Sequence, residues 1–349
     1  MTIGTVSGAP EYQFHRIQDV VRTRDGSIVV IDGSRTVRLY DGTGAHVWTA
    51  GGEGDGPGEF RYPYSVLELA ADSVGVWDGR VNRLSVFTGE GQYVRSVTVS
   101  ALDLPTAAWG LTGRGELLVE ARRVERTVIG GHTAILHPSD FYLVGVNGEI
   151  SRNLGRRMYA IGYQEIDENG AFSSAIFATE AVVAPSADGL WYGDAEDYEL
   201  REEVGADETR RIIRWQGPDR TISDADVKAV LAKWSEGAEP EVRSYLAEYG
   251  RTHPRADKFP AYEQLIMDQP GRLWIQNYVR DHLDDGWRYW MVLSSAGTEL
   301  LARVKTPAAI EIHDIGDDWL LGVTQDELGV GSVVLLAIVS DPERTLAFK

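Results

Sequence analysis

The sequence contains no cysteine among its 349 residues. This absence excludes disulfide bonds, zinc–thiolate sites and thiol nucleophiles, although it does not decide the cellular compartment. The seven histidines form no i, i+4 pair and no HExxH pattern, so a zinc site is not indicated. A GxSxG serine motif is missing as well. No catalytic motif in the chain is therefore specific enough to name a reaction.

Basic residues are also scarce, since 34 lysines and arginines face 53 acidic residues and the formal charge is −19. Nucleic acids and anionic lipids are bound through basic surfaces, so neither is expected as a partner. No apolar run approaches the roughly 18 residues that span a bilayer, and the N-terminus lacks the pattern of a signal peptide. We predict a soluble monomer whose partner is a small molecule or a protein segment.

What the chain does contain is an internal repeat. The segment Gly26–Gly44 resembles Asp72–Gly91, and Asp32 and Asp78 hold equivalent places 46 residues apart. A period of 40 to 50 residues made of short strands is typical of propeller blades. The repeat therefore predicts an all-β fold.

The fold that we expect is a single domain, residues 1–349, forming a six-bladed β-propeller. Blades one and two run over about 17–49 and 65–99, and the later second strands are expected at Gly115–Val119, Asp188–Tyr192, Gly271–Ile275 and Trp319–Val323. The Pro-Glu-aromatic loops around Glu11 and Glu59 repeat after 48 residues. They place residues 2–6 as an outer strand that completes blade six beside 333–339, because an open ring would leave free edges.

One segment, about 221–258, breaks the β pattern between blades four and five. Ser223 starts a capping-box pattern that is followed by an apolar stripe at helical spacing. Pro240 opens a second stripe, which Gly250 should close from a C′ position. We expect a helical hairpin on the face of the propeller that is usually used for binding.

The residues also resemble a known family. Asp78, Asn82-Arg83-Leu84, Phe87 and Gly91 are similar to the NHL repeat, and Gly52–Phe60 is similar to a loop of bacterial six-bladed propellers of the NHL/TolB-like group. The resemblance covers residues 1–100 best and implies a propeller that binds a ligand or a protein. It also implies a periplasmic or secreted location.

Three basic islands stand out in this acidic chain, and the topology places them on the face of the helical hairpin. Arginine forks clamp carboxylates or sulfates, so we interpret the islands as a binding mouth with an aromatic edge. Ordinary pairing with nearby carboxylates is the alternative. The candidate ligand-binding residues are Arg122, Arg123, Arg126, His132, Arg156, Arg157, His253, Arg255 and Trp287.

Carboxylates near the starts of the inner strands should face the central channel: Asp19, Glu180, Glu263 and Glu311. Six-bladed lactonases hold Ca²⁺ with residues at such positions, so the resemblance implies a Ca²⁺ site and a hydrolase of lactone or ester type. The alternative is that these carboxylates only line a solvated channel. His313-Asp314 is interpreted as a turn.

These observations leave three hypotheses for the function. A binding module is the first, the calcium-dependent hydrolase the second, and a structural scaffold the third.

Overall fold

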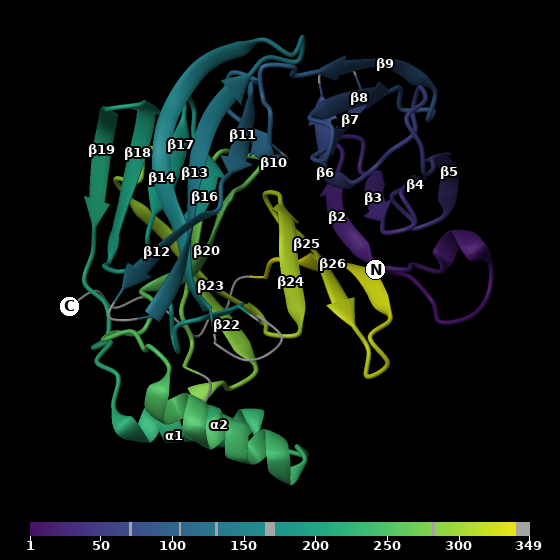
Figure 1. Ribbon diagram of the computed structural model, residues 1–349. Helices are drawn as coiled ribbons and strands as arrows, with labels where there is room; N and C mark the ends of the chain where they lie inside the picture. Colours follow the sequence, from purple (N-terminus) through teal and green to yellow (C-terminus); the bar gives the residue numbers. More distant parts are fainter. Residues whose placement is uncertain (70–71, 105, 130–131, 165–171, 281–282, 340–349) are drawn as a thin grey trace.

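The computed structural model describes residues 1–69, 72–104, 106–129, 132–164, 172–280 and 283–339, in six sheets and one helical hairpin (Figure 1). We number the sheets in chain order. Sheets 1 and 2 contain β2 (Ile17–Arg22), β3 (Ile28–Asp32), β4 (Thr36–Tyr40), β5 (His46–Gly51), β6 (Pro63–Leu69), β7 (Ser73–Asp78), β8 (Arg83–Phe87) and β9 (Tyr93–Thr98). Sheet 3 contains β10 (Thr106–Leu111), β11 (Leu117–Arg122), β12 (Glu125–Ile129), β13 (His132–Val144), β14 (Ile150–Gln164) and β15 (Phe172–Ser174).

The second half of the chain repeats the pattern of antiparallel strands. Sheets 4 and 5 contain β16 (Val182–Pro185), β17 (Leu190–Gly193), β18 (Glu199–Gly205), β19 (Glu208–Arg214), β20 (Tyr262–Met267), β21 (Leu273–Asn277), β22 (Trp287–Leu293) and β23 (Leu300–Pro307). Sheet 6 contains β24 (Ile310–Ile315), β25 (Trp319–Gln325), β26 (Gly331–Ala337) and β1 (Thr2–Ile3). A short 3-10 helix, η1 (Pro10–Tyr12), follows β1.

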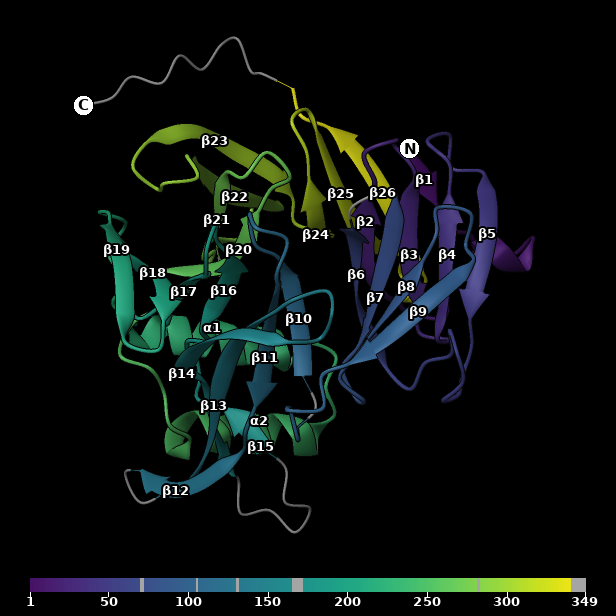
Figure 2. The same cartoon turned by 90° about the horizontal axis from the view of Figure 1, so that it is seen from above.

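The six sheets stand around a common centre, as the view from above shows (Figure 2). Each first strand contacts the first strand of the next sheet, and β24 returns to contact β2. A separate hydrophobic cluster lies between each pair of neighbouring sheets, sheets 6 and 1 included. This arrangement is a β-propeller, and it explains why the second strands are buried on both faces.

The second strands expected from the sequence are confirmed. The whole of β3 is buried, and Trp77, Trp191 and Trp274 on later second strands are at most 2% exposed. Burial of one such large side chain stabilises the fold by roughly 1.5–3 kcal/mol. These tryptophans are therefore part of the packing between sheets.

Sheet 6 is completed by the N-terminus, because β1 pairs antiparallel with β26 through Thr2↔Val334 and Ile3↔Val333. Ile3 is 2% exposed within the cluster between sheets 6 and 1. The strand is shorter than the expected 2–6, since Gly4 has a φ of +131° and leaves the extended region.

Asp32 and Asp78 are fully buried at the ends of β3 and β7 and play equivalent roles. The Asp78 carboxylate accepts hydrogen bonds from the backbone N–H groups of Arg61, Tyr62 and Arg80. Asp32 likewise accepts from backbone groups on both sides of its strand. Each carboxylate thus fixes the loop that enters its sheet as well as the turn that follows.

The helical hairpin consists of α1 (Asp224–Trp234) and α2 (Pro240–Thr252) between β19 and β20. Ser223 and Asp226 form the expected capping box. The expectation for Gly250 was wrong: α2 continues to Thr252, and a Cβ on Gly250 would meet Leu231 Cδ1 at 2.2 Å. The glycine therefore allows the helices to approach closely. Among the described residues, no helix is long and apolar enough to cross a membrane.

Sheet 3 departs most from the repeat. The basic segment between Arg122 and His132 contains β12, which pairs with β13 and extends the sheet toward the helical hairpin (Figure 1). Val124, Thr127 and Val128 are β-branched residues that favour such a strand. The extension leaves all five residues of β12 exposed.

Candidate functional site

The helical hairpin marks the end of the propeller where the first strands of sheets 4 and 5 begin. Ile176, just before β16, packs against Val227 and Val230 of α1 and pairs with Arg255 beyond α2. Ile176 N donates to the carbonyl of Pro254 at 3.0 Å. We call this end of the ring the mouth.

The buried carboxylate of Glu120, 1% exposed, organises a cluster at the mouth beside sheet 3. It accepts hydrogen bonds from Trp109 Nε1 at 3.0 Å and from Arg122 Nε at 3.1 Å, and Ser139 Oγ donates to it as well. The Arg122 guanidinium carbon lies 4.1 Å from the centroid of the Tyr159 ring. We call Trp109, Glu120, Arg122 and Tyr159 the arginine platform.

Aromatic rings lie within and beside the arginine platform. Tyr159 and Trp109 have ring centroids 6.4 Å apart, and Tyr62 stacks on Tyr64 at 6.2 Å. Burial raises the pKa of Tyr159 to about 12, and burial also raises that of Tyr64 while the charge of Arg122 opposes the rise. Both phenols are therefore protonated donors at neutral pH. The platform offers one fixed cation among flat aromatic faces.

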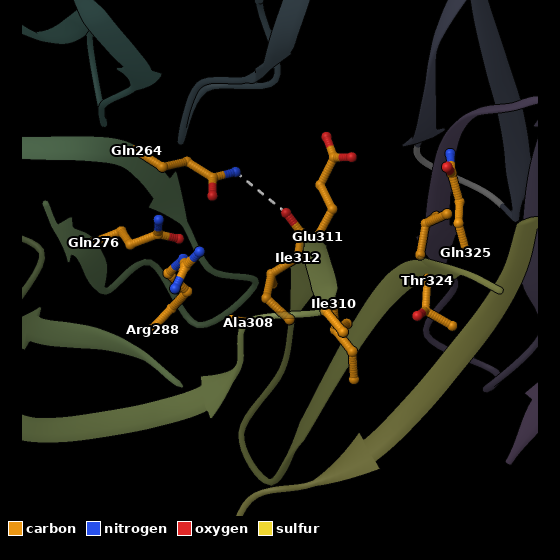
Figure 3. A pocket seen from close by; sticks show the side chains of 11 residues that line it. Gln264, Gln276, Arg288, Ala308, Ile310, Glu311, Ile312, Thr324 and Gln325 are labelled. Carbon is orange, nitrogen blue, oxygen red and sulfur yellow. Dashed lines mark hydrogen bonds between the residues drawn. The ribbon is translucent and has the colours of Figure 1, made fainter. Parts of the chain in front are cut away.

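A cleft of about 470 Å³ lies between sheets 5 and 6 (Figure 3). Gln264 spans it and donates from Nε2 to the carbonyl of Ile312 at 3.2 Å. Arg288 makes two contacts with the Asp284 carboxylate, at 3.1 and 3.3 Å. The lining residues are Gln264, Gln276, Arg288, Ala308, Ala309, Ile310, Glu311, Ile312, Val323, Thr324 and Gln325.

The reading of His313-Asp314 as a turn was wrong, because both residues lie within β24 and join sheet 6 to sheet 1. Asp314 Oδ2 accepts from the backbone N–H of Arg22 at 2.9 Å, and burial raises the pKa of Asp314 to about 6. Burial alone would lower the pKa of His313, but its hydrogen bond with Asp19 leaves it raised. A bulge in β24 between Ile312 and Asp314 places these side chains here, and the sequence offered no signal for it.

The arginines of sheet 3 are divided between the two faces of that sheet. Arg122 and Arg157 share the face toward sheet 4, and Arg157 pairs with Glu203 at 3.4 Å. Arg123 and Arg156 share the opposite face, where both bind the Asp140 carboxylate at 2.6 and 2.8 Å. Each of these four arginines therefore pairs with a carboxylate of the chain, while Arg126 and His132 lie exposed on β12 and β13.

The other candidate residues lie near the helical hairpin and sheet 5. The His253 ring stacks on Tyr249 of α2 at 4.2 Å, and Arg255 pairs with Asp224 of α1 at 3.0 Å, so the second contact joins the two ends of the hairpin. Trp287 is half-buried, and the amino group of Lys305 lies 4.4 Å from its ring centroid.

The four candidate metal ligands do not converge on one point: two of them contact His313 and a third contacts Gln276. Asp19 Oδ1 contacts His313 Nδ1, and Glu263 accepts from Gln276 at 2.6 Å. Glu311 lies 3.8 Å from His313 Nε2, and Glu180 is exposed before β16. Within the described ranges, no group of three or more His, Cys, Asp or Glu side chains is arranged to hold a metal ion. The calcium site remains a prediction from the repeat.

Comparison with known proteins adds a likeness of fold. Neither a scan against protein-family models nor a search of curated proteins finds a match. Similar solved structures include a putative exported protein from Bacteroides fragilis, which is 12% identical with a TM-score of 0.52, covering 98% of this chain and 95% of that one.

Two further structures are similar at lower scores. A member of the duf4221 family from Bacteroides vulgatus is 9% identical, with a TM-score of 0.47 and 97% of each chain covered. The catalytically inactive virginiamycin B lyase from Staphylococcus aureus, solved with quinupristin, is 10% identical, with a TM-score of 0.44, covering 97% of this chain and 99% of that one. TM-scores below 0.5 support no inference about this chain, so the Bacteroides fragilis protein shows a shared fold and nothing about activity.

Proposed function

We propose that the chain is a six-bladed β-propeller of the NHL/TolB-like group whose mouth binds a small molecule or a protein segment. Six sheets, six clusters between them and the β1–β26 pair support this interpretation. The sheets form a rigid frame, and binding residues on a rigid frame lose little conformational entropy when a ligand arrives.

The observation that carries the proposal is the arrangement of Arg122 on the arginine platform. Glu120 is nearly fully buried, and its carboxylate accepts hydrogen bonds from Trp109, Ser139 and Arg122. A buried carboxylate is costly unless its hydrogen bonds are satisfied. Here the hydrogen bonds to Glu120 hold the Arg122 guanidinium against the Tyr159 ring, while the Arg122 side chain stays 44% exposed.

The platform suits a ligand with a hydrogen-bond acceptor on a flat group. Glu120 accepts hydrogen bonds from Nε and Nη2 of Arg122, so Nη1 and the second hydrogen of Nη2 remain as a fork of donors for a ligand. Tyr62, Tyr64 and Trp109 supply rings on which a planar group can stack. A carboxylate attached to an aromatic or other planar group satisfies both features.

Benzoate is a direct probe of this chemistry. We expect it to raise the Tm of the wild-type chain in a dose-dependent way and to shift NMR signals near Arg122, because a ligand that binds only the folded state stabilises it. Arg122→Met should abolish both effects. Benzamide, which has the ring without the charge, should bind more weakly than benzoate.

Arg303→Met is the matched control, since Arg303 lies exposed on β23, the outer strand of sheet 5. That variant should keep the benzoate response. If Arg122→Met responds to benzoate as the wild type does, or if neither chain responds, the arginine platform is not a carboxylate site.

We further propose that the helical hairpin roofs the mouth and that the chain works as a monomer outside the cytoplasm. The packing of α1 on Ile176 supports the first point, and the resemblance to exported propellers supports the second. The alternative of a calcium-dependent hydrolase is supported only by the positions of the four candidate metal ligands in the repeat.

A further inference from the structure

The cleft between sheets 5 and 6 lies apart from the arginine platform on sheet 3, and we propose that it is a second binding site, for a neutral carbohydrate of one or two rings. Its volume of about 470 Å³ falls within the range of roughly 300–1,000 Å³ of small-molecule sites. Side chains from β20, β21, β22, β24 and β25 line it, so the site belongs to rigid strands (Figure 3).

Two glutamines present fixed acceptors to the cleft. Gln264 donates from Nε2 to the Ile312 carbonyl, and Gln276 donates from Nε2 to Glu263 Oε2 at 2.6 Å. Because each amide nitrogen is engaged, each side chain is held in one orientation with its carbonyl oxygen left to accept. Immobilised side chains lose less entropy on binding than free ones.

Donors and mixed groups line the rest of the cleft. Thr324 and Gln325 both carry groups that donate and accept, and neither side chain bonds another group in the described part of the chain. Arg288 Nε adds a donor beyond the two nitrogens that Asp284 occupies. A hydroxyl group both donates and accepts, so a ring with several hydroxyls matches this mixture better than a ligand of one polarity.

The charges of the cleft do not select a small anion. The Arg288 guanidinium is already neutralised by the Asp284 carboxylate, and Glu311 lies 3.8 Å from His313. The apolar part of the wall is made of short aliphatic side chains, Ala308, Ala309 and Ile310. Such a wall suits the C–H face of a sugar ring, whose burial adds the hydrophobic part of the binding energy.

An extended peptide fits less well. Strand addition to the inner edge of β24 would require free backbone carbonyls, and Gln264 already occupies that of Ile312. The neutral carbohydrate is therefore the occupant that the cleft favours.

The test uses a panel of neutral sugars: glucose, galactose, N-acetylglucosamine, maltose and cellobiose. We expect at least one to give saturation-transfer NMR signals and a saturable titration with the wild-type chain. Gln276→Leu should raise its Kd at least tenfold, because a fixed acceptor is lost. Ala309→Trp should abolish binding by filling the cleft from an exposed position. Gln92→Leu, on an exposed turn of sheet 2, should leave the Kd unchanged.

The two proposed sites can fail separately. Arg122→Met should leave sugar binding intact, and Ala309→Trp should leave benzoate binding intact. The carbohydrate proposal is overturned if no sugar of the panel binds the wild type, if binding survives Ala309→Trp, or if an uncharged hexapeptide competes for the cleft while the sugars do not. Circular dichroism of each variant establishes that a loss of binding is not a loss of fold.

Discussion

His313 Nδ1 lies 2.9 Å from Asp19 Oδ1, which joins the first strand of sheet 6 to the first strand of sheet 1 across 294 positions of the sequence. The contact belongs to a wider pattern between neighbouring first strands. Ser65 donates to the Ala108 carbonyl from sheet 2 to sheet 3, and Gln264 reaches Ile312 from sheet 5 to sheet 6. Polar side chains therefore link the sheets near the axis, in addition to the hydrophobic clusters between them.

The His313–Asp19 pair predicts a pH-dependent contribution to stability. The pKa of His313 is raised in the folded state, so its stabilisation is complete below its unfolded value of about 6.5 and is lost as the pH rises through the folded pKa. Glu311 and Asp314 also face the ring and act in the same direction. His313→Asn should lose more stability relative to the wild type at pH 5 than at pH 8, measured by urea denaturation.

His15→Asn is the control for that experiment, because His15 is exposed on the loop before β2. Because the side chain is exposed, its stability gap from the wild type should be small at both pH values. A gap for His313→Asn that stays constant or widens toward pH 8 would contradict the assignment.

The sequence predicted the repeat better than the site, and His313 shows why. Equivalent residues such as Asp32 and Asp78 recur because sheets 1 and 2 need the same backbone contacts. The first strands of sheets 1, 2, 3 and 5 bulge as well as that of sheet 6, but the pairing of a histidine with Asp19 belongs to one junction, so the repeat could not indicate it. Arg122 and Arg123 were grouped because they are neighbours in sequence, yet successive residues of a strand point to opposite faces. The positions of single side chains around the ring depend on such local register.

The buried carboxylates at the ends of the second strands should be essential for stability. Asp78→Ala leaves three backbone N–H groups without their acceptor in a site that is fully buried. Each unsatisfied buried donor costs about 1–3 kcal/mol, so we expect a loss of at least about 3 kcal/mol in urea denaturation. Asp78→Asn keeps an acceptor and should lose less. Asp41→Ala, in a surface turn, is the control, and an equal loss there would refute the role of Asp78.

The β1–β26 pair should close the ring energetically as well as geometrically. Ile3→Asp places an uncompensated charge in the cluster between sheets 6 and 1, where Ile3 is 2% exposed. We expect a loss of about 3 kcal/mol or more, together with concentration-dependent association, because β26 becomes a free edge. Val6→Asp, at a position 59% exposed, should change neither. Light scattering and urea denaturation measure the two effects, and a monomeric Ile3→Asp chain of wild-type stability would contradict this view.

The helical hairpin should detach without unfolding the propeller. Its contact with the ring rests on a small cluster in which Ile176, Val227 and Val230 are buried, and α2 buries no residue fully. Val230→Asp should therefore expose the hairpin to limited proteolysis while the main thermal transition stays within a few degrees of the wild type. Val76→Asp, a change of the same kind in the core between sheets 1 and 2, should instead abolish that transition.

The same variant tests whether the hairpin covers the mouth. If it does, Val230→Asp should weaken benzoate binding at Arg122, since a loosened roof no longer excludes water from the charged contact. Arg251→Ala, which removes an exposed ion pair with Glu248 on α2, is the matched change that leaves the hairpin docked. It should leave both the proteolysis pattern and the benzoate titration unchanged. Wild-type affinity in a Val230→Asp chain whose hairpin is cleaved would show that the mouth works without a roof.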